Sequence, residues 1–447
     1  MTALRLTATG GDGATPDPRS QAVADAGPAF WWRGIPPAAL AIALVTVVFA
    51  VVFPNLWYGE FDVSDISIYQ EHAFAMAEGR LPYRDFDLEY PPLAAALFAL
   101  PGHTGEFAAY AHWFSVLMYL ATAATVTLVV LTAAAIWPAD WRIWLAAVTT
   151  ATAVAAVGTI VENRFDMAVA LSLVATVFAL VRGRLLPAAF VLGLGFALKL
   201  TPAVLLPLVL IVAGTPRRAL ASAAVFTVAA VLPFVPYLAV APRGVLHVIT
   251  YHIERPLQIE SVLATPFLVG HVLRRTTVEI VTSYGSQGIE AAGARAATTA
   301  GTAVMAASLV TVIWLLWRAR TALRQHLDLL PVAAFALVLA GMTFGKVLSP
   351  QFLIWLVPLV PLVLVRDPLL GGFGLLTLAL TQIGFPAKYW GLVYLETPAI
   401  LWLTTRNVAL VTTFALAAAR LARVGRAAPE AAGPAHLACG PATPVVR

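Results

Sequence analysis

The segment Asp65-Ile-Ser-Ile-Tyr69-Gln-Glu-His72 places three reactive side chains at helical spacing. Asp65 suits an N-cap position, and apolar residues follow it at helical intervals, so the pattern predicts a short amphipathic helix along the membrane surface. Its spacing puts the carboxylate, the phenol and the imidazole on one face. A carboxylate held there can accept a proton from a hydroxyl as a general base. The alternative is that Asp65 only caps the helix and that Asp62 only solvates the loop.

Polar residues interrupt the apolar sequence at two later places. Arg164 and Asp166 lie where two apolar runs meet, and they could bind a ligand or form a structural pair. Further on, the run Tyr251-His-Ile-Glu-Arg-Pro-Leu-Gln-Ile-Glu-Ser261 combines a cation, carboxylates and an amide before another apolar stretch. That combination suits the rim of a site for a polar headgroup.

The elements that position these residues must cross a membrane. Of the 447 residues, 60% are hydrophobic and only 11% are charged, whereas soluble domains carry about 25% charged residues. Roughly a dozen apolar runs approach the ~20 residues that a helix needs to span the hydrocarbon core. Only helices or closed barrels satisfy every backbone polar group in lipid. We therefore predict an all-α, polytopic transmembrane bundle with about 12 crossings.

Arginine distribution predicts the sidedness of the bundle. Arginines flank the ends of the spans on one side, which the positive-inside rule places in the cytoplasm together with both termini. We expect a multi-pass plasma-membrane protein with its site on the extracytoplasmic side. The predicted regions are a disordered cytoplasmic tail at 1–31, a transmembrane domain at 32–426 with outer loops at 55–91 and 242–297, and a second disordered cytoplasmic tail at 427–447.

Two apolar stretches depart from simple spans. The stretch 185–213 has arginines at both ends, which predicts a hairpin of two short helices broken around Lys199-Leu-Thr-Pro202. The piece 261–273 is too short to span and is predicted to be re-entrant or interfacial.

All three lysines of the chain, Lys199, Lys346 and Lys388, fall on the predicted outer side, so that lysine inverts the positive-inside rule that arginine follows. Two of them precede a proline by three or four residues, and such breaks put irregular backbone where it can line a cavity. A cavity with these cations and the acidic residues of 55–91 suits a ligand that couples a phosphate to a neutral polar group. The alternative is that each lysine reaches a lipid headgroup or pairs with a loop carboxylate.

Several functions find no support in the sequence. It has no phosphate-binding loop, dinucleotide fingerprint or nucleophile elbow, and the basic pI of about 9.5 comes from dispersed arginines rather than from a nucleic-acid-binding stripe. No histidine pair has metal-ligand spacing. We predict no metal ligands, no cofactor and no nucleic-acid partner, although the acidic loop leaves room for a divalent metal ion.

Taken in order, these motifs resemble the polyprenyl-phosphate-dependent glycosyltransferases of the GT-C superfamily, specifically glycosyltransferase family 87, which includes actinobacterial mannosyltransferases. The similarity extends over about 55–390. The motifs that carry it are Asp65-Ile-Ser-Ile-Tyr69, Gly79-Arg-Leu-Pro-Tyr83 through Glu89-Tyr-Pro-Pro92, Arg164-Phe-Asp166, Gly193 through Lys199-Leu-Thr-Pro202, Arg255-Pro-Leu-Gln-Ile-Glu-Ser261 and Gly345-Lys-Val-Leu-Ser-Pro-Gln351.

The resemblance implies a GT-C-like fold and transfer of a hexose, with mannose favoured, from a polyprenyl-phosphate sugar to a hydroxyl of an envelope glycolipid or polysaccharide, with inversion. It implies that Asp65 is the catalytic base, with Glu89 as a second candidate, and that the lipid tail lies between helices. Cations would stabilise the departing phosphate. The residues expected to bind substrate are Tyr69, His72, Tyr90, Arg164, Asp166, Lys199, Arg255, Gln258, Glu260, Lys346 and Gln351.

Two other classes of function fit the same features. A transporter or flippase for a lipid-linked or anionic solute would also use outer cations and broken helices, although we find no internal repeat of the kind common in transporters. A non-catalytic scaffold for other envelope enzymes is the third possibility.

Overall fold

The structure is a computed structural model that describes residues 29–56, 58, 63–102, 105–137 and 141–430. Within these residues, five helical stretches are long and apolar enough to cross a membrane, and seven shorter apolar helices accompany them. The predicted all-α transmembrane fold is confirmed, while the count of about 12 crossings stays a prediction. Most of the two predicted tails, and Asp62, lie outside the described residues.

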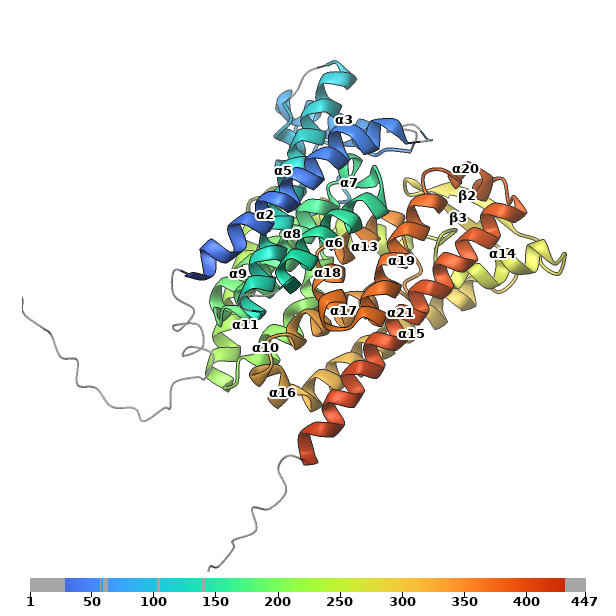
Figure 1. Ribbon diagram of the computed structural model, residues 1–447. Helices are drawn as coiled ribbons and strands as arrows, with labels where there is room; N and C mark the ends of the chain where they lie inside the picture. Colours follow the sequence, from blue (N-terminus) through green and yellow to red (C-terminus); the bar gives the residue numbers. More distant parts are fainter. Residues whose placement is uncertain (1–28, 57, 59–62, 103–104, 138–140, 431–447) are drawn as a thin grey trace, which may run out of the picture.

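The helices pack side by side into one bundle (Figure 1). The elements of its first half are α2 (Ala29–Val47), η1 (Val48–Val52), η2 (Phe53–Asn55), α3 (Ile66–Ala77), α4 (Pro92–Ala99), α5 (Phe107–Ile136), α6 (Trp141–Val157), α7 (Ile160–Asn163), α8 (Asp166–Val181), α9 (Leu185–Leu198), η3 (Thr201–Leu205), α10 (Leu206–Val212) and α11 (Pro216–Val231). The second half has η4 (Leu232–Phe234), α12 (Val235–Val240), α13 (Pro242–Glu254), β1 (Leu257–Gln258), η5 (Val262–Ala264), α14 (Thr265–Val272), β2 (Glu279–Ser283), β3 (Ser286–Glu290), α15 (Ala294–Arg318), α16 (Arg320–Gln325), α17 (Leu329–Met342), η6 (Pro350–Leu356), α18 (Leu359–Arg366), α19 (Pro368–Gly384), α20 (Tyr389–Val393) and α21 (Thr397–Glu430).

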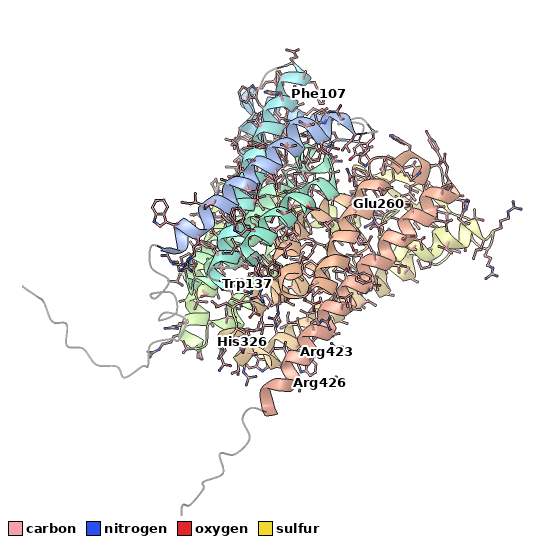
Figure 2. All side chains as sticks on the ribbon, viewed as in Figure 1. Phe107, Trp137, Glu260, His326, Arg423 and Arg426 are labelled. Carbon is pink, nitrogen blue, oxygen red and sulfur yellow. The ribbon has the colours of Figure 1, made fainter. Side chains whose placement is uncertain are left out.

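The two ends of the bundle differ in character. Figure 2 shows Phe107 and Glu260 towards one end, and His326, Arg423 and Arg426 towards the other. The α3 helix and the β2–β3 hairpin lie at the end that holds Glu260 (Figure 1). Arg423 and Arg426 therefore lie at the end opposite Glu260, and the sidedness stays a prediction.

The break around Lys199 lies where the sequence predicts it. The α8 helix runs away from Asp166 and α9 returns, so that Lys199 comes to lie beside Asp166, and η3 and α10 then lead away again. Pro202 stands in the first turn of η3, where its missing N–H leaves no hydrogen bond unmade. A Cβ at Gly193 would approach the Phe226 carbonyl to 2.6 Å, so glycine is what lets α9 pack closely against α11.

The segment 242–297, predicted to be an outer loop, contains a small sheet that the sequence analysis missed. In the described part of the chain its strand order is β1-β3-β2, with both pairs antiparallel. Tyr284 and Gly285 both have positive φ, the backbone of a two-residue hairpin turn. Strand β1 pairs with β3 and belongs to the segment that follows α13. The backbone N–H of Gln258 in β1 donates to the Lys346 carbonyl at 3.0 Å, which connects this segment to Lys346. The short helix α14 agrees with the prediction that 261–273 does not span.

Candidate functional site

Asp65 stands at the N-cap position of α3, as predicted, but its side chain has another partner. Among the described residues, no backbone amide donates to the Asp65 carboxylate as a cap, and the Ser64 hydroxyl instead accepts from the Ile66 amide at 3.1 Å. The carboxylate turns to Arg164, whose Nε lies 3.1 Å from Oδ2. The Tyr69 hydroxyl lies 3.5 Å from the same oxygen. Capping therefore does not account for Asp65.

Arg164 and Asp166 do not pair with each other. Arg164 lies in extended backbone between α7 and α8, and its Nη2 also donates to the Val63 carbonyl at 3.2 Å, which ties the first outer loop to the bundle. Asp166, at the start of α8, is fully buried. Its Oδ1 accepts from Lys199 Nζ and from Trp355 Nε1, both at 2.7 Å.

An aromatic cage surrounds the Lys199 ammonium. Its Nζ lies 4.7 Å from the ring centroid of Phe165 and 5.4 Å from those of Phe352 and Trp355. Cation–π attraction and the Asp166 carboxylate together stabilise a charge that lipid alone would not tolerate. Gln351, at the start of η6, stands half-buried beside Phe352.

Glu89 and Tyr90 lie beside α3, near the end of the loop 78–91 that joins α3 to α4. Tyr83 has positive φ and donates to the Tyr90 carbonyl at 2.6 Å, which holds the loop closed. Burial raises the pKa of Glu89, and the nearby charge of Asp65 raises this pKa further. His72 Nε2 lies 3.9 Å from Glu89 Oε2, and burial lowers the pKa of His72 to about 4. The imidazole is therefore neutral at neutral pH, and this contact is not an ion pair there.

Arg255 and Lys346 have different surroundings. Lys346 Nζ donates to the Arg255 carbonyl at 2.7 Å and to the Ile253 carbonyl, which caps the C-terminal end of α13. Arg255 lies with its guanidinium 5.8 Å from the Tyr251 ring centroid. Its buried Nε finds no hydrogen-bond partner among the described residues.

Gln258 and Glu260 follow Arg255 in the chain, in β1 and just after it. Both are buried, and burial raises the pKa of Glu260 to about 7. Arg406 of α21 donates to the Glu260 backbone carbonyl at 2.8 Å rather than to its carboxylate. Lys388 lines the narrow pocket that Glu260 and Arg406 share.

The structure thus gathers the predicted residues from six places in the chain at one end of the bundle. Asp65 and Arg255 both lie close enough to Glu89 for their charges to act on its pKa, which Asp65 raises and Arg255 lowers. The charges of all three residues also act on the pKa of Tyr251. Sequence reasoning missed Trp355 and Arg406. An ionisable residue within the apolar run 399–419 is a signal for Arg406, whereas Trp355 is one of many apolar residues in its segment. Among the side chains described, no three His, Cys, Asp or Glu lie together as a possible metal site.

The fold and the site define an integral membrane protein with a buried, mixed-charge site at one end of a helical bundle. The sequence profile of glycosyltransferase family 87 matches residues 88–350. The chain therefore belongs to glycosyltransferase family 87, and it is an integral membrane glycosyltransferase. The predicted resemblance is confirmed.

The chain was also compared with solved structures and with curated protein sequences. A crystal structure of ArnT from Cupriavidus metallidurans in the apo state is similar to this chain, with 14% sequence identity and a TM-score of 0.43. The similarity covers 86% of this chain and 78% of the ArnT chain. Comparison with curated protein sequences gives no match.

Proposed function

We propose that the protein transfers a hexose, with mannose favoured, from a polyprenyl-phosphate sugar to a hydroxyl of an envelope glycolipid or polysaccharide on the extracytoplasmic side. The observation that carries the proposal is the state of Asp65. In a member of a glycosyltransferase family, this carboxylate is turned away from the helix cap and held by Arg164 beside Glu89 and Arg255.

Asp65 is the general base of the proposed reaction. The acceptor hydroxyl oxygen attacks the anomeric carbon and gives its proton to the Asp65 carboxylate. The bond between the anomeric carbon and the phosphate oxygen breaks, and its electron pair leaves with polyprenyl phosphate, which inverts the anomeric centre. The Asp65 side chain is 23% exposed, so a hydroxyl can reach it. Arg164 holds the carboxylate in place, with its Nε 3.1 Å from Asp65 Oδ2.

Arg255 is the principal ligand of the departing phosphate in this proposal. Its guanidinium has donors to spare, because Nε finds no partner among the described residues, and a guanidinium matches phosphate oxygens in pairs. Lys199 and Lys346 already have protein partners. Lys346 would position Arg255 through its carbonyl, and Lys199 would add positive potential from behind Asp166.

Glu89 is the second candidate for the base. Its raised pKa favours the protonated form more than an ordinary glutamate does. A protonated Glu89 would donate a hydrogen bond to substrate, whereas the salt-bridged Asp65 would accept one. We therefore assign proton acceptance to Asp65 and substrate orientation to Glu89 together with Tyr90. Tyr69 is fully buried, so its part is to position Asp65 through its hydroxyl. The transporter and scaffold alternatives lose ground because the chain belongs to a glycosyltransferase family.

The test is transfer of radiolabelled mannose from polyprenyl-phosphate mannose to envelope lipids and glycans, in membranes with wild type, Asp65→Asn or Glu89→Gln. We expect Asp65→Asn to lower the rate about 10²–10⁴-fold and Glu89→Gln to lower it less. Asp85→Asn, in the same loop, is the matched control, because Asp85 pairs only with Arg84 and the Leu81 amide among the described residues. Full activity in Asp65→Asn would remove Asp65 from the mechanism. Absence of label transfer in every membrane would favour another sugar donor or the transport alternative.

A further inference from the structure

A second cavity lies beside α3. It has a volume of about 570 Å³ and opens to solvent. This volume falls within the range of about 300–1,000 Å³ that is usual for small-molecule sites. The residues that line it come from α3, from the loop that follows α3 and from the segment just before α5: Gln70, Glu71, His72, Phe74, Ala75, Arg80, Phe86, Asp87 and Gly105. We call it the α3 pocket.

The lining of the α3 pocket combines aromatic rings with hydrogen-bonding groups. Phe74 is 43% exposed, although it belongs to a loop helix outside the predicted spans. Glu71 and Asp87 offer carboxylate oxygens, and Arg80 offers guanidinium donors. A pyranose ring has an apolar C–H face, which packs on an aromatic ring, and a rim of hydroxyls, which exchange hydrogen bonds with carboxylates and guanidinium groups. Two carboxylates against one guanidinium disfavour an anionic lipid headgroup.

His72 separates the α3 pocket from the proposed reaction centre. Its ring stacks on Phe86 at 5.5 Å, with an interplanar angle of 21°. Its Nε2 is buried on the opposite side, 3.9 Å from Glu89 Oε2, with no hydrogen-bond partner among the described residues. A ligand that fills the pocket therefore comes within one side chain of the two carboxylates.

We propose that the α3 pocket binds the acceptor glycan, namely the sugar units next to the one that carries the attacking hydroxyl. This inference rests on the proposed transferase function and deepens it, because it makes the acceptor an oligosaccharide or polysaccharide rather than a single headgroup. The pocket opens to solvent, so the rest of a longer glycan has room to leave it. His72 bridges the two parts of the site and positions the reacting unit.

The test is to measure acceptor KM with oligosaccharides that are released from the envelope and separated by length. We expect KM in the wild type to fall about tenfold from one sugar unit to three, because one added ring that packs well on Phe74 contributes about that factor. In Phe74→Ala and Asp87→Asn, KM for the long fractions should rise about tenfold, which removes the length dependence. Phe107→Ala and Glu279→Gln are the controls, since Phe107 is 42% exposed and neither residue lines the pocket.

Saturation-transfer NMR on the solubilised full-length protein, with the same fractions and no donor, separates this inference from the proposed reaction. Binding of long fractions that weakens in Phe74→Ala, without turnover in any assay, would keep the pocket and discard the reaction. Turnover with a KM independent of length, or variants that behave as the controls do, would overturn the pocket assignment. Competition by vesicles of anionic phospholipid, but not by oligosaccharide, would also overturn it.

Discussion

The segment 164–166 contributes one residue to each of two ion pairs, and the two pairs differ in how far their carboxylates are exposed. Arg164 holds Asp65, whose side chain is 23% exposed, whereas Asp166 holds Lys199 and is fully buried. Asp166 Oδ1 also accepts from the Trp355 indole, and the Lys199 ammonium lies in an aromatic cage, so both donors to this oxygen come from the protein. Asp65 keeps oxygen lone pairs towards the site. We therefore propose that the same residue types serve structure in one pair and chemistry in the other.

The largest effect expected from this comparison concerns stability. Asp166→Asn leaves the Lys199 ammonium without its counter-charge in a buried site, and such a change costs about 3–5 kcal/mol of unfolding free energy. The double variant Asp166→Asn/Lys199→Met removes both charges and should recover to within about 1–2 kcal/mol of the wild type. Unfolding in a mixed-micelle SDS titration measures all three proteins.

Asp65→Asn is the matched control, because its partner Arg164 keeps two backbone acceptors. We expect its unfolding free energy to stay within about 1 kcal/mol of the wild type, although transfer should fall about 10²–10⁴-fold. If Asp65→Asn destabilises the protein as much as Asp166→Asn does, or if the double variant is no better than the single one, the two pairs do not differ in the way proposed.

The sequence predicted positions better than partners. Lys199 and Pro202 located the break in the hairpin because proline and an intramembrane cation each constrain the backbone locally. The N-cap position of Asp65 was also predictable from spacing, but its contact with Arg164 joins residues about a hundred positions apart and follows only from the packed bundle. The indole of Trp355 is a similar case, since nothing local distinguishes it from an apolar core residue.

The small sheet was not predictable for a different reason. Its hairpin turn, Tyr284-Gly285, lacks the Asn-Gly or Asp-Gly pair that usually announces such a turn. Its strands have at most five residues, and β1 has two. Sequence reasoning therefore located Arg255, Gln258 and Glu260 as a group. It did not find the pairing of β1 with β3, or the hydrogen bonds that join Arg255 and Gln258 to Lys346.

Glu260 extends the comparison to a buried carboxylate that is not held by an ion pair. The unfolded carboxyl ionises near 4.5, whereas the folded one stays protonated up to about 7. Between these values the folded state binds more protons, so stability falls as pH rises. Because one pKa unit is worth about 1.4 kcal/mol, the wild type should lose about 2–3 kcal/mol of unfolding free energy between pH 5 and pH 8.

Glu260→Gln should remove most of this slope, and unfolding titrations at the two pH values measure it. The exposed Glu279 provides the control, because Glu279→Gln should keep the wild-type slope. A slope that is unchanged in Glu260→Gln would mean that Arg406 keeps the Glu260 carboxylate ionised, and Glu260 would then belong with Asp166 rather than apart from it.

The smallest expected effect concerns the Arg164–Asp65 pair, whose carboxylate is partly exposed. Arg164→Lys keeps a cation beside Asp65 but loses the planar fork that reaches the Val63 carbonyl. We expect a loss of only about 1 kcal/mol in unfolding free energy, the usual value of one hydrogen bond. Transfer should fall more steeply, because a lysine cannot fix the carboxylate in one orientation. Arg84→Lys, at the exposed Asp85 pair, should change neither quantity. A variant that unfolds easily yet transfers sugar normally would show that Arg164 anchors the loop and that Asp65 acts without its help.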